Sequence, residues 1–180
     1  MVYMLLGNGF EETEAVAPLD ILRRAGIPVM TVGINGKTVR GSHDICIEAD
    51  ITLGELDLTD LEMIIVPGGR DGVAAIGSCS DAMNTLKFAW DNDKFVAAIC
   101  AGPSVLAALG ITDGKNVTCY PGWEPKMASA NMVPGAAVVR DGKLITGTSA
   151  GCSVPFGLAL VEALKGPDAA KAVAELMVIR

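Results

Sequence analysis

Two continuous runs of apolar residues, Met63–Val66 and Phe95–Ile99, most constrain how this chain can fold. A strand that is apolar at every position needs cover on both faces, which is the situation of a central strand in a parallel sheet. Val2–Leu6 has the same character. We therefore expect a mostly parallel sheet with helices packed against both of its faces.

Amphipathic patterns and turn signals fill the stretches between these runs. Spacings of three and four residues predict helices, and short apolar runs predict further strands. Asn35-Gly36 and Asp141-Gly142 are strong turn signals, and Pro18 interrupts the first helical pattern. The expected helices cover residues 11–25, 80–91, 104–109, 154–164 and 168–177, and the further strands cover 27–34, 39–40, 45–47, 117–119, 136–140 and 143–146. No repeat, low-complexity segment or linker divides the chain, so we expect one α/β domain over residues 1–180.

Composition and charge exclude several classes of function. Aromatic residues make up only 4% of the chain against 51% hydrophobic residues, so the core must be built from small aliphatic side chains. A net charge of −7 without a long basic run predicts no nucleic-acid partner. No apolar run approaches the roughly 20 residues of a membrane-spanning helix, and the N-terminal segment lacks the basic start of a signal peptide. Five cysteines without a CxxC pair argue against a disulfide framework and a zinc site, so we expect a cytoplasmic protein without a metal.

Cys100 has the most specific context of the five cysteines. It comes directly after the Phe95–Ile99 strand and before a helix, so we expect its side chain on a tight, strained turn above the sheet. The N-terminus of the helix would then lower the pKa of the thiol. The backbone N–H groups of Ala101 and of Gly69, on the neighbouring Pro67-Gly68-Gly69 loop, are the expected donors of an anion pocket.

Glu14 is the second candidate for chemistry. Glu11, Glu12 and Glu14 stand at the start of the first helix, where acidic residues stabilise the helix dipole. Position 14 differs because it shares a face with Pro18 and Ile21, which should point inward. A buried carboxyl has a raised pKa and stays protonated, so it could donate a hydrogen bond to a thiolate and move a proton.

The other cysteines and the single histidine have weaker contexts. Cys119 ends a short strand beside Tyr120, and Cys152 precedes a helix. His43 lies in a segment that reads as an exposed hairpin, so we expect it to be solvated. We interpret Cys46, Cys79, Cys119 and Cys152 as structural cysteines.

Several motifs resemble a known family, over nearly the whole length of the chain. They are Gly9-Phe10-Glu11-Glu12-Thr13-Glu14-Ala15-Val16, Arg23-Arg24-Ala25-Gly26-Ile27, Val66-Pro67-Gly68-Gly69, Ala97-Ala98-Ile99-Cys100-Ala101-Gly102-Pro103 and Phe156-Gly157-Leu158-Ala159-Leu160-Val161-Glu162-Ala163-Leu164. With them the chain resembles the ThiJ/PfpI superfamily, whose domain is class I glutamine amidotransferase-like, and within it the clade of the Parkinson-associated deglycase.

The resemblance implies a flavodoxin-like three-layer sandwich that forms a homodimer. It assigns Cys100 as the reactive cysteine, Glu14 as its protonated partner, and Gly69 and Ala101 as backbone donors. Members of the clade are described as cofactor-free glyoxalases or deglycases that act on methylglyoxal and its adducts. Others are described as oxidative-stress sensors or chaperones.

The chain departs from the family pattern at three positions. The protease-like branch has a histidine directly after the cysteine, where this chain has Ala101, so peptidase activity is not expected. The deglycase clade often has a histidine where this chain has Tyr120, and an arginine where it has Thr148. We expect Tyr120, Thr148 and Gly68 to line the site.

Two functions fit these residues. In the first, the thiolate of Cys100 attacks a small 2-oxoaldehyde and Glu14 moves a proton between its carbons. In the second, the protein is a non-catalytic stress protein whose Cys100 oxidises to a sulfinate that the protonated Glu14 stabilises. A third, hydrolase-like function needs a histidine that the sequence does not place near Cys100.

Overall fold

A seven-stranded sheet forms the centre of the molecule in the computed structural model, which describes residues 1–179. Its strand order is β10-β11-β7-β6-β1-β2-β5, and every neighbouring pair is parallel except β10 and β11. The strands are β1 (Val2–Leu6), β2 (Val29–Gly33), β5 (Ile51–Thr52), β6 (Met63–Val66), β7 (Phe95–Ile99), β10 (Val138–Asp141) and β11 (Leu144–Gly147). The expected parallel sheet is confirmed, and the three continuous apolar runs form its adjacent strands β1, β6 and β7.

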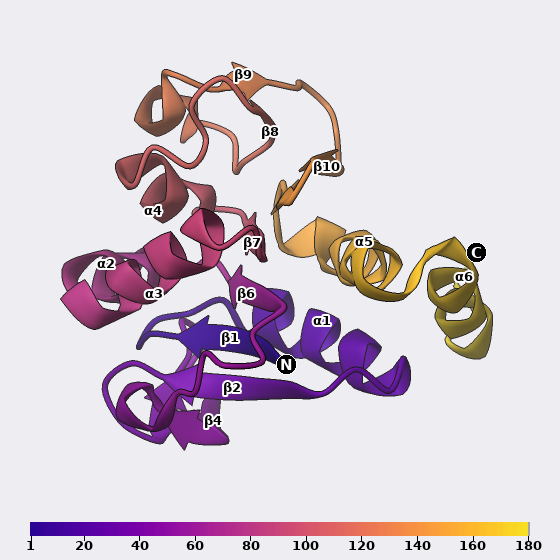
Figure 1. Cartoon of the computed structure of the whole chain (residues 1–180), viewed down its shortest axis with the longest axis horizontal. Coiled ribbons are helices and arrows are strands. Elements are labelled where there is room, and N and C mark those ends of the chain that lie inside the picture. The colour runs from indigo at the N-terminus through magenta and orange to yellow at the C-terminus, as the bar shows by residue number, and fades with distance from the viewer. Residues whose placement is uncertain (180) are drawn as a thin grey trace.

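Helices cover both faces of the sheet, which gives three layers (Figure 1). One apolar core packs α1 (Glu12–Arg24), α5 (Ser153–Lys165) and α6 (Pro167–Leu176) against one face. A second core packs α2 (Arg70–Ser78), α3 (Ser80–Asp91) and α4 (Pro103–Ala108) against the other. The flavodoxin-like α/β sandwich is therefore confirmed.

The first helix runs through Pro18 as one continuous element. Proline removes one hydrogen bond from a helix interior, so packing has to stabilise the helix there. α1 lies beside α5, and Gly157 of α5 allows the close approach, because a Cβ at Gly157 would lie 3.1 Å from the Cα of Pro18. The inward face of α1, which carries Glu14, is thus pressed against the rest of the fold.

Two small sheets flank the central one. β3 (Thr38–Arg40) pairs with β4 (Cys46–Glu48) in the expected antiparallel hairpin, and β8 (Asn116–Val117) pairs with β9 (Asn131–Met132). Three short 3₁₀ helices cover Leu53–Glu55, Glu124–Met127 and Ala150–Cys152. No helix within residues 1–179 is both long enough and apolar enough to cross a membrane.

Candidate active site

Cys100 stands on a strained turn directly after β7. Its φ of 64° lies in the left-handed region, which a non-glycine residue rarely adopts, so the predicted strained turn is confirmed. Its backbone N–H donates to the carbonyl of Gly147 (2.9 Å), which ties the turn to β11. Gly102 lets the chain turn at once into α4, because a Cβ there would lie 2.7 Å from the carbonyl oxygen of Val66.

Glu14 reaches this turn from the inward face of α1 and is fully buried. Its Oε2 accepts a hydrogen bond from the backbone N–H of Gly68 (2.8 Å). Its Oε1 has no hydrogen-bond partner of ordinary geometry within residues 1–179, although the thiol of Cys100 lies close enough to influence the pKa of the carboxyl. The structure therefore brings the two predicted residues together.

Burial controls the protonation of this pair. It raises the pKa of Glu14 to about 7, against the lowering effect of the nearby Cys100 thiol and of the hydrogen bond from Gly68. Burial and, after it, the negative charge of Glu14 raise the pKa of the Cys100 thiol to about 12. The pair therefore loses two protons in two steps, and between these steps the carboxyl of Glu14 is ionised while the sulfur keeps its proton.

The lowered thiol pKa expected from a helix N-terminus is not found. α4 has only six residues, so its dipole is weak, and burial beside a carboxyl has the larger effect. The backbone N–H groups of Ala101 and Gly69 do face the sulfur and lower its pKa in part. A thiolate at Cys100 near neutral pH therefore requires transfer of the thiol proton to the carboxylate of Glu14.

Cys100 opens into a cavity of about 560 Å³. Besides Cys100, four of the predicted site residues line it, namely Glu14, Gly69, Ala101 and Tyr120. Its other lining residues are Glu11, His43, Arg70, Trp123, Ser149, Ala150 and Gly151. Gly68 lies behind the pair rather than in the wall, because a Cβ there would lie 2.3 Å from Oε2 of Glu14 and 2.7 Å from Cβ of Cys100.

Thr148 was predicted to line the site, and the structure contradicts this. Its hydroxyl contacts the hydroxyl of Thr118 (2.8 Å) and the carbonyl of Ala136, so the side chain faces a separate cavity, which Cys119 also lines. The next residue along the chain, Ser149, reaches the Cys100 cavity instead. Successive side chains of an extended chain point to opposite sides, so Thr148 and Ser149, just after β11, face different cavities.

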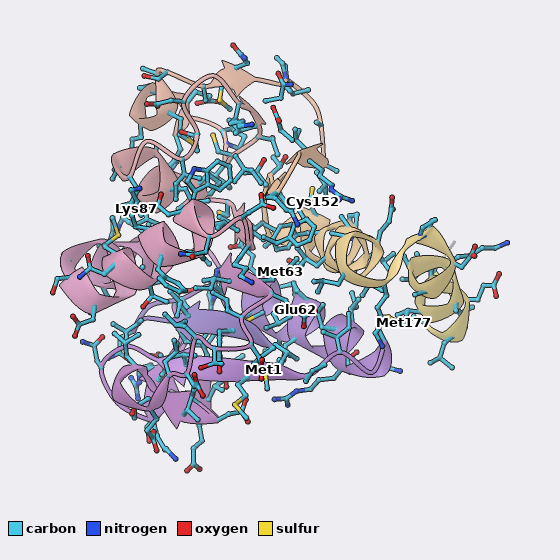
Figure 2. The ribbon with its side chains drawn as sticks, in the orientation of Figure 1. Met1, Glu62, Met63, Lys87, Cys152 and Met177 are labelled. Atoms are coloured by element: carbon cyan, nitrogen blue, oxygen red, sulfur yellow. The ribbon has the colours of Figure 1, made fainter. Side chains whose placement is uncertain are left out.

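The remaining cysteines lie outside this cavity. Cys119 is buried, and its thiol contacts the carbonyl of Tyr120 (3.4 Å). Burial raises the pKa of this thiol to about 11. Cys152 lies where the chain enters α5 (Figure 2), near the hydroxyl of Ser149. Neither cysteine has the turn geometry of Cys100.

His43 was expected to be a solvated loop residue away from the site, and this is wrong in part. Its side chain is 70% exposed, but it lines the same cavity as Cys100. Its Nδ1 lies 2.9 Å from Oε2 of Glu12, and its backbone N–H donates to Oε1 of Glu12 (2.7 Å). The sequence could not show this, because residues 11–12 and 41–45 meet only in the folded chain.

Three side chains of types that can bind metals lie close together, with their ligand atoms within 4.8 Å of one another; they belong to Glu11, Glu12 and His43. The carboxylate of Glu12 already accepts hydrogen bonds from the backbone of His43 and Ile45 and from the hydroxyl of Ser42. We therefore interpret Glu12 as the anchor of the 41–45 loop.

Sequence reasoning also missed Arg70 and Trp123 of the cavity wall, whereas the 149–151 segment lies within a strand end, residues 146–153, at which a site could be expected. Arg70 begins α2, a helix that the sequence pattern did not predict. The signal available for residues 149–151 was their place in a run of small polar residues after a strand end, where sites form in parallel sheets.

Comparison with known proteins agrees with this geometry. The model of the DJ-1/PfpI family matches residues 1–163. Protein dj-1beta of Drosophila melanogaster is 35% identical over 178 residues, which cover 98% of this chain and 95% of that protein. The crystal structure of Drosophila DJ-1beta superposes with a TM-score of 0.95 at 34% identity, covering 99% of this chain and 97% of that one.

A further relative carries an enzyme name. The glutathione-independent glyoxalase DJR-1.2 of Caenorhabditis elegans is 31% identical over 160 residues, which cover 88% of this chain and 84% of that protein. The family match, the full-length relatives and the shared fold together lead to one conclusion: the chain belongs to the DJ-1/PfpI family.

Proposed function

We propose that this protein is a cofactor-free glyoxalase or deglycase that acts on small 2-oxoaldehydes such as methylglyoxal through Cys100 and Glu14. The observation that carries the proposal is the buried carboxyl of Glu14 beside a cysteine that faces an open cavity. The glyoxalase among the relatives supports the same reaction class.

Proton transfer from Cys100 to Glu14 begins the reaction. Glu14 takes the proton of the thiol, the sulfur of Cys100 forms a bond to the aldehyde carbon, and the same proton passes to the aldehyde oxygen to give a hemithioacetal, which leaves Glu14 as a carboxylate. The backbone N–H groups of Gly69 and Ala101 are placed to stabilise the oxygen that becomes negative.

Proton transfer between two carbons then completes the internal redox change. A carboxylate at Glu14 removes the proton from the former aldehyde carbon and returns it to the neighbouring ketone carbon. The hydroxyl proton of the hemithioacetal passes to the ketone oxygen, so the first carbon is oxidised to a thioester, the second is reduced to an alcohol, and no external oxidant is consumed. Water cleaves the thioester to a 2-hydroxy acid and frees Cys100.

Turnover of methylglyoxal without glutathione tests this proposal. We expect Cys100→Ser to abolish lactate formation, and Glu14→Gln to lower kcat by about 100-fold or more, the size usual for loss of a general acid–base. Cys46→Ser, at an exposed site on β4, is the matched control and should keep full activity. Wild-type rates in Cys100→Ser or Glu14→Gln would refute the proposal.

A second candidate function is favoured by the unpartnered Oε1 of Glu14. In this function, peroxide oxidises Cys100 to a sulfinate, and the protonated Glu14 donates a hydrogen bond to a sulfinate oxygen. The protein would then act as a redox sensor or a chaperone-like stress protein. The two functions are compatible, because both use the same sulfur.

Mass spectrometry after mild peroxide treatment separates selective from general oxidation. We expect two oxygens on Cys100 in the wild type and a slower gain in Glu14→Gln. Oxidation spread evenly over all five cysteines would exclude the sensor function.

The assembly and the location of the protein belong to the same proposal. We infer a homodimer that works in the cytoplasm, with a small aldehyde as its partner molecule. Sedimentation equilibrium tests the first inference, since a monomer at micromolar concentration would contradict it.

A further inference from the structure

His43 presents an oriented imidazole to the cavity of Cys100. The loop that carries it is held at several points: the N–H of Ser42 donates to the carbonyl of Phe10 (2.8 Å), and the N–H of Gly41 donates to the carbonyl of Ile45 (2.9 Å). Gly41 also packs against the side chain of Glu12, because a Cβ there would lie 2.2 Å from Oε1. The imidazole is exposed, but the backbone beneath it is fixed.

Glu12 determines which nitrogen of His43 is free. Burial raises the pKa of Glu12, but hydrogen bonds from the side chain and backbone of His43 outweigh it and lower that pKa to about 2. A carboxylate can only accept, so Nδ1 of His43 carries a proton toward Oε2, at 2.9 Å. Nε2 therefore remains available to the cavity as a base. A carboxylate that orients an imidazole in this way is the arrangement of a catalytic acid–base pair.

The release step of the proposed reaction needs a base that can reach a water molecule. Glu14 is fully buried and, in the proposed reaction, acts on the carbons of the substrate. A general base for hydrolysis has to lie within hydrogen-bond reach of the attacking water, and an exposed side chain in the cavity wall can take that water from solvent. His43 lines the cavity and is 70% exposed, so it meets both conditions.

We propose that His43, oriented by Glu12, is the general base that activates the water which releases the product from Cys100. The inference rests on the proposed thiol chemistry. The water oxygen forms a bond to the thioester carbon, and its proton passes to Nε2. The carbon–sulfur bond breaks, its electron pair returns to the sulfur, and the proton held on Nε2 neutralises the thiolate. The hydroxy acid then leaves.

The charges around His43 determine the pH dependence of this step. Glu12 on α1, Glu11 just before it and Asp44 on the same loop raise the pKa of His43, and the hydrogen bond to Glu12 is the largest cause. Glu14, Arg70 and Tyr120 line the same cavity. Because only the neutral imidazole is a base, product release slows as the pH falls through the raised pKa of His43.

His43→Gln separates release from the earlier chemistry. Mixed with methylglyoxal and followed by rapid-quench mass spectrometry, this variant should form the Cys100 adduct at the wild-type rate and then accumulate it. Steady-state turnover should fall by about 100-fold, and the slope of release rate against pH should disappear. Asp44→Asn, which removes a neighbouring loop charge, is the control and should release product within about twofold of wild type.

A second variant distinguishes a base from a merely structural side chain. His43→Ala should regain release when free imidazole is added, in proportion to its neutral form. Normal release in His43→Gln, or slow adduct formation together with slow release, would overturn the role of His43 while the Cys100 chemistry stands. Absence of both adduct and turnover in the wild type would instead overturn the proposed function, and the role of His43 with it.

Discussion

Gly68 is the residue that lets the carboxyl of Glu14 and the thiol of Cys100 meet. A Cβ at this position would lie 2.3 Å from Oε2 of Glu14 and 2.7 Å from Cβ of Cys100. We expect Gly68→Ala to displace the carboxyl, lower turnover as strongly as Glu14→Gln, and cost about 1–3 kcal/mol of stability. Steady-state kinetics and urea unfolding check this. Gly54→Ala is the control, because nothing lies within 4 Å of its added Cβ; equal behaviour of the two variants would contradict the close contact.

Ionisation of Glu14 should weaken the fold as the pH rises. The pKa of its carboxyl is about 7 in the folded protein against 4.5 in its ordinary state, so the unfolded chain releases this proton first. Stability of the wild type relative to Glu14→Gln should therefore fall between about pH 4.5 and 7, by about 3 kcal/mol. Urea unfolding at pH 4.5 and pH 8 measures the difference, and a constant difference would contradict the raised pKa.

Sequence reasoning identified the residues of the site better than their surroundings. Cys100 and Glu14 could be predicted because their elements have clear apolar patterns. Cys100 directly follows a continuous apolar strand, and Glu14 lies on the inward face of a predicted helix. Thr148 was misplaced because the face of a side chain at a strand end depends on a register shift of one residue. His43 was undervalued because the hydrogen bonds of its loop to Phe10 and Glu12 join segments about 30 residues apart.

At the scale of elements, Gly157 allows α5 to pack closely against α1. A Cβ there would lie 2.8 Å from Cδ1 of Ile21 and 3.1 Å from the Cα of Pro18. We expect Gly157→Ala to destabilise the protein by about 1–3 kcal/mol, despite the better helix propensity of alanine. Thermal unfolding tests this against Gly77→Ala on α2, whose added Cβ would meet only a methyl group of Val105, at 3.3 Å. A stabilised Gly157→Ala variant would show that the helices can separate freely.

Whether a helix or strand could be predicted depends on how clear its sequence pattern is. β6, β7 and α3 match their predicted ranges, since each has an unbroken apolar run or a clear helical spacing. α2 was missed because Gly72 and Gly77 weaken its helical pattern. β5, with two residues, forms only by pairing with β2, so no local signal exists for it.

At the scale of the whole molecule, both cores share one sheet and should unfold together. Phe156 is buried in the core with α1, α5 and α6, whereas Trp90 packs against the core on the opposite face. We expect Phe156→Ala to cost about 3–5 kcal/mol and to shift the tryptophan fluorescence and circular dichroism transitions equally. A fluorescence transition that stays at the wild-type denaturant concentration would show two independent units instead of one domain.

The coupling of Glu14 to Cys100 is the central claim, and the pH dependence of Cys100 alkylation by iodoacetamide tests it most directly. In the wild type, the alkylation rate should rise only well above pH 8.5, because burial and the negative charge of Glu14, which is ionised above about pH 7, raise the pKa of the thiol to about 12. In Glu14→Gln the rise should move to lower pH, because the negative charge is lost while burial still raises the pKa of the thiol. The same ordinary thiol midpoint, near pH 8.5, in both proteins would contradict the coupling of the two groups and with it the proposed chemistry.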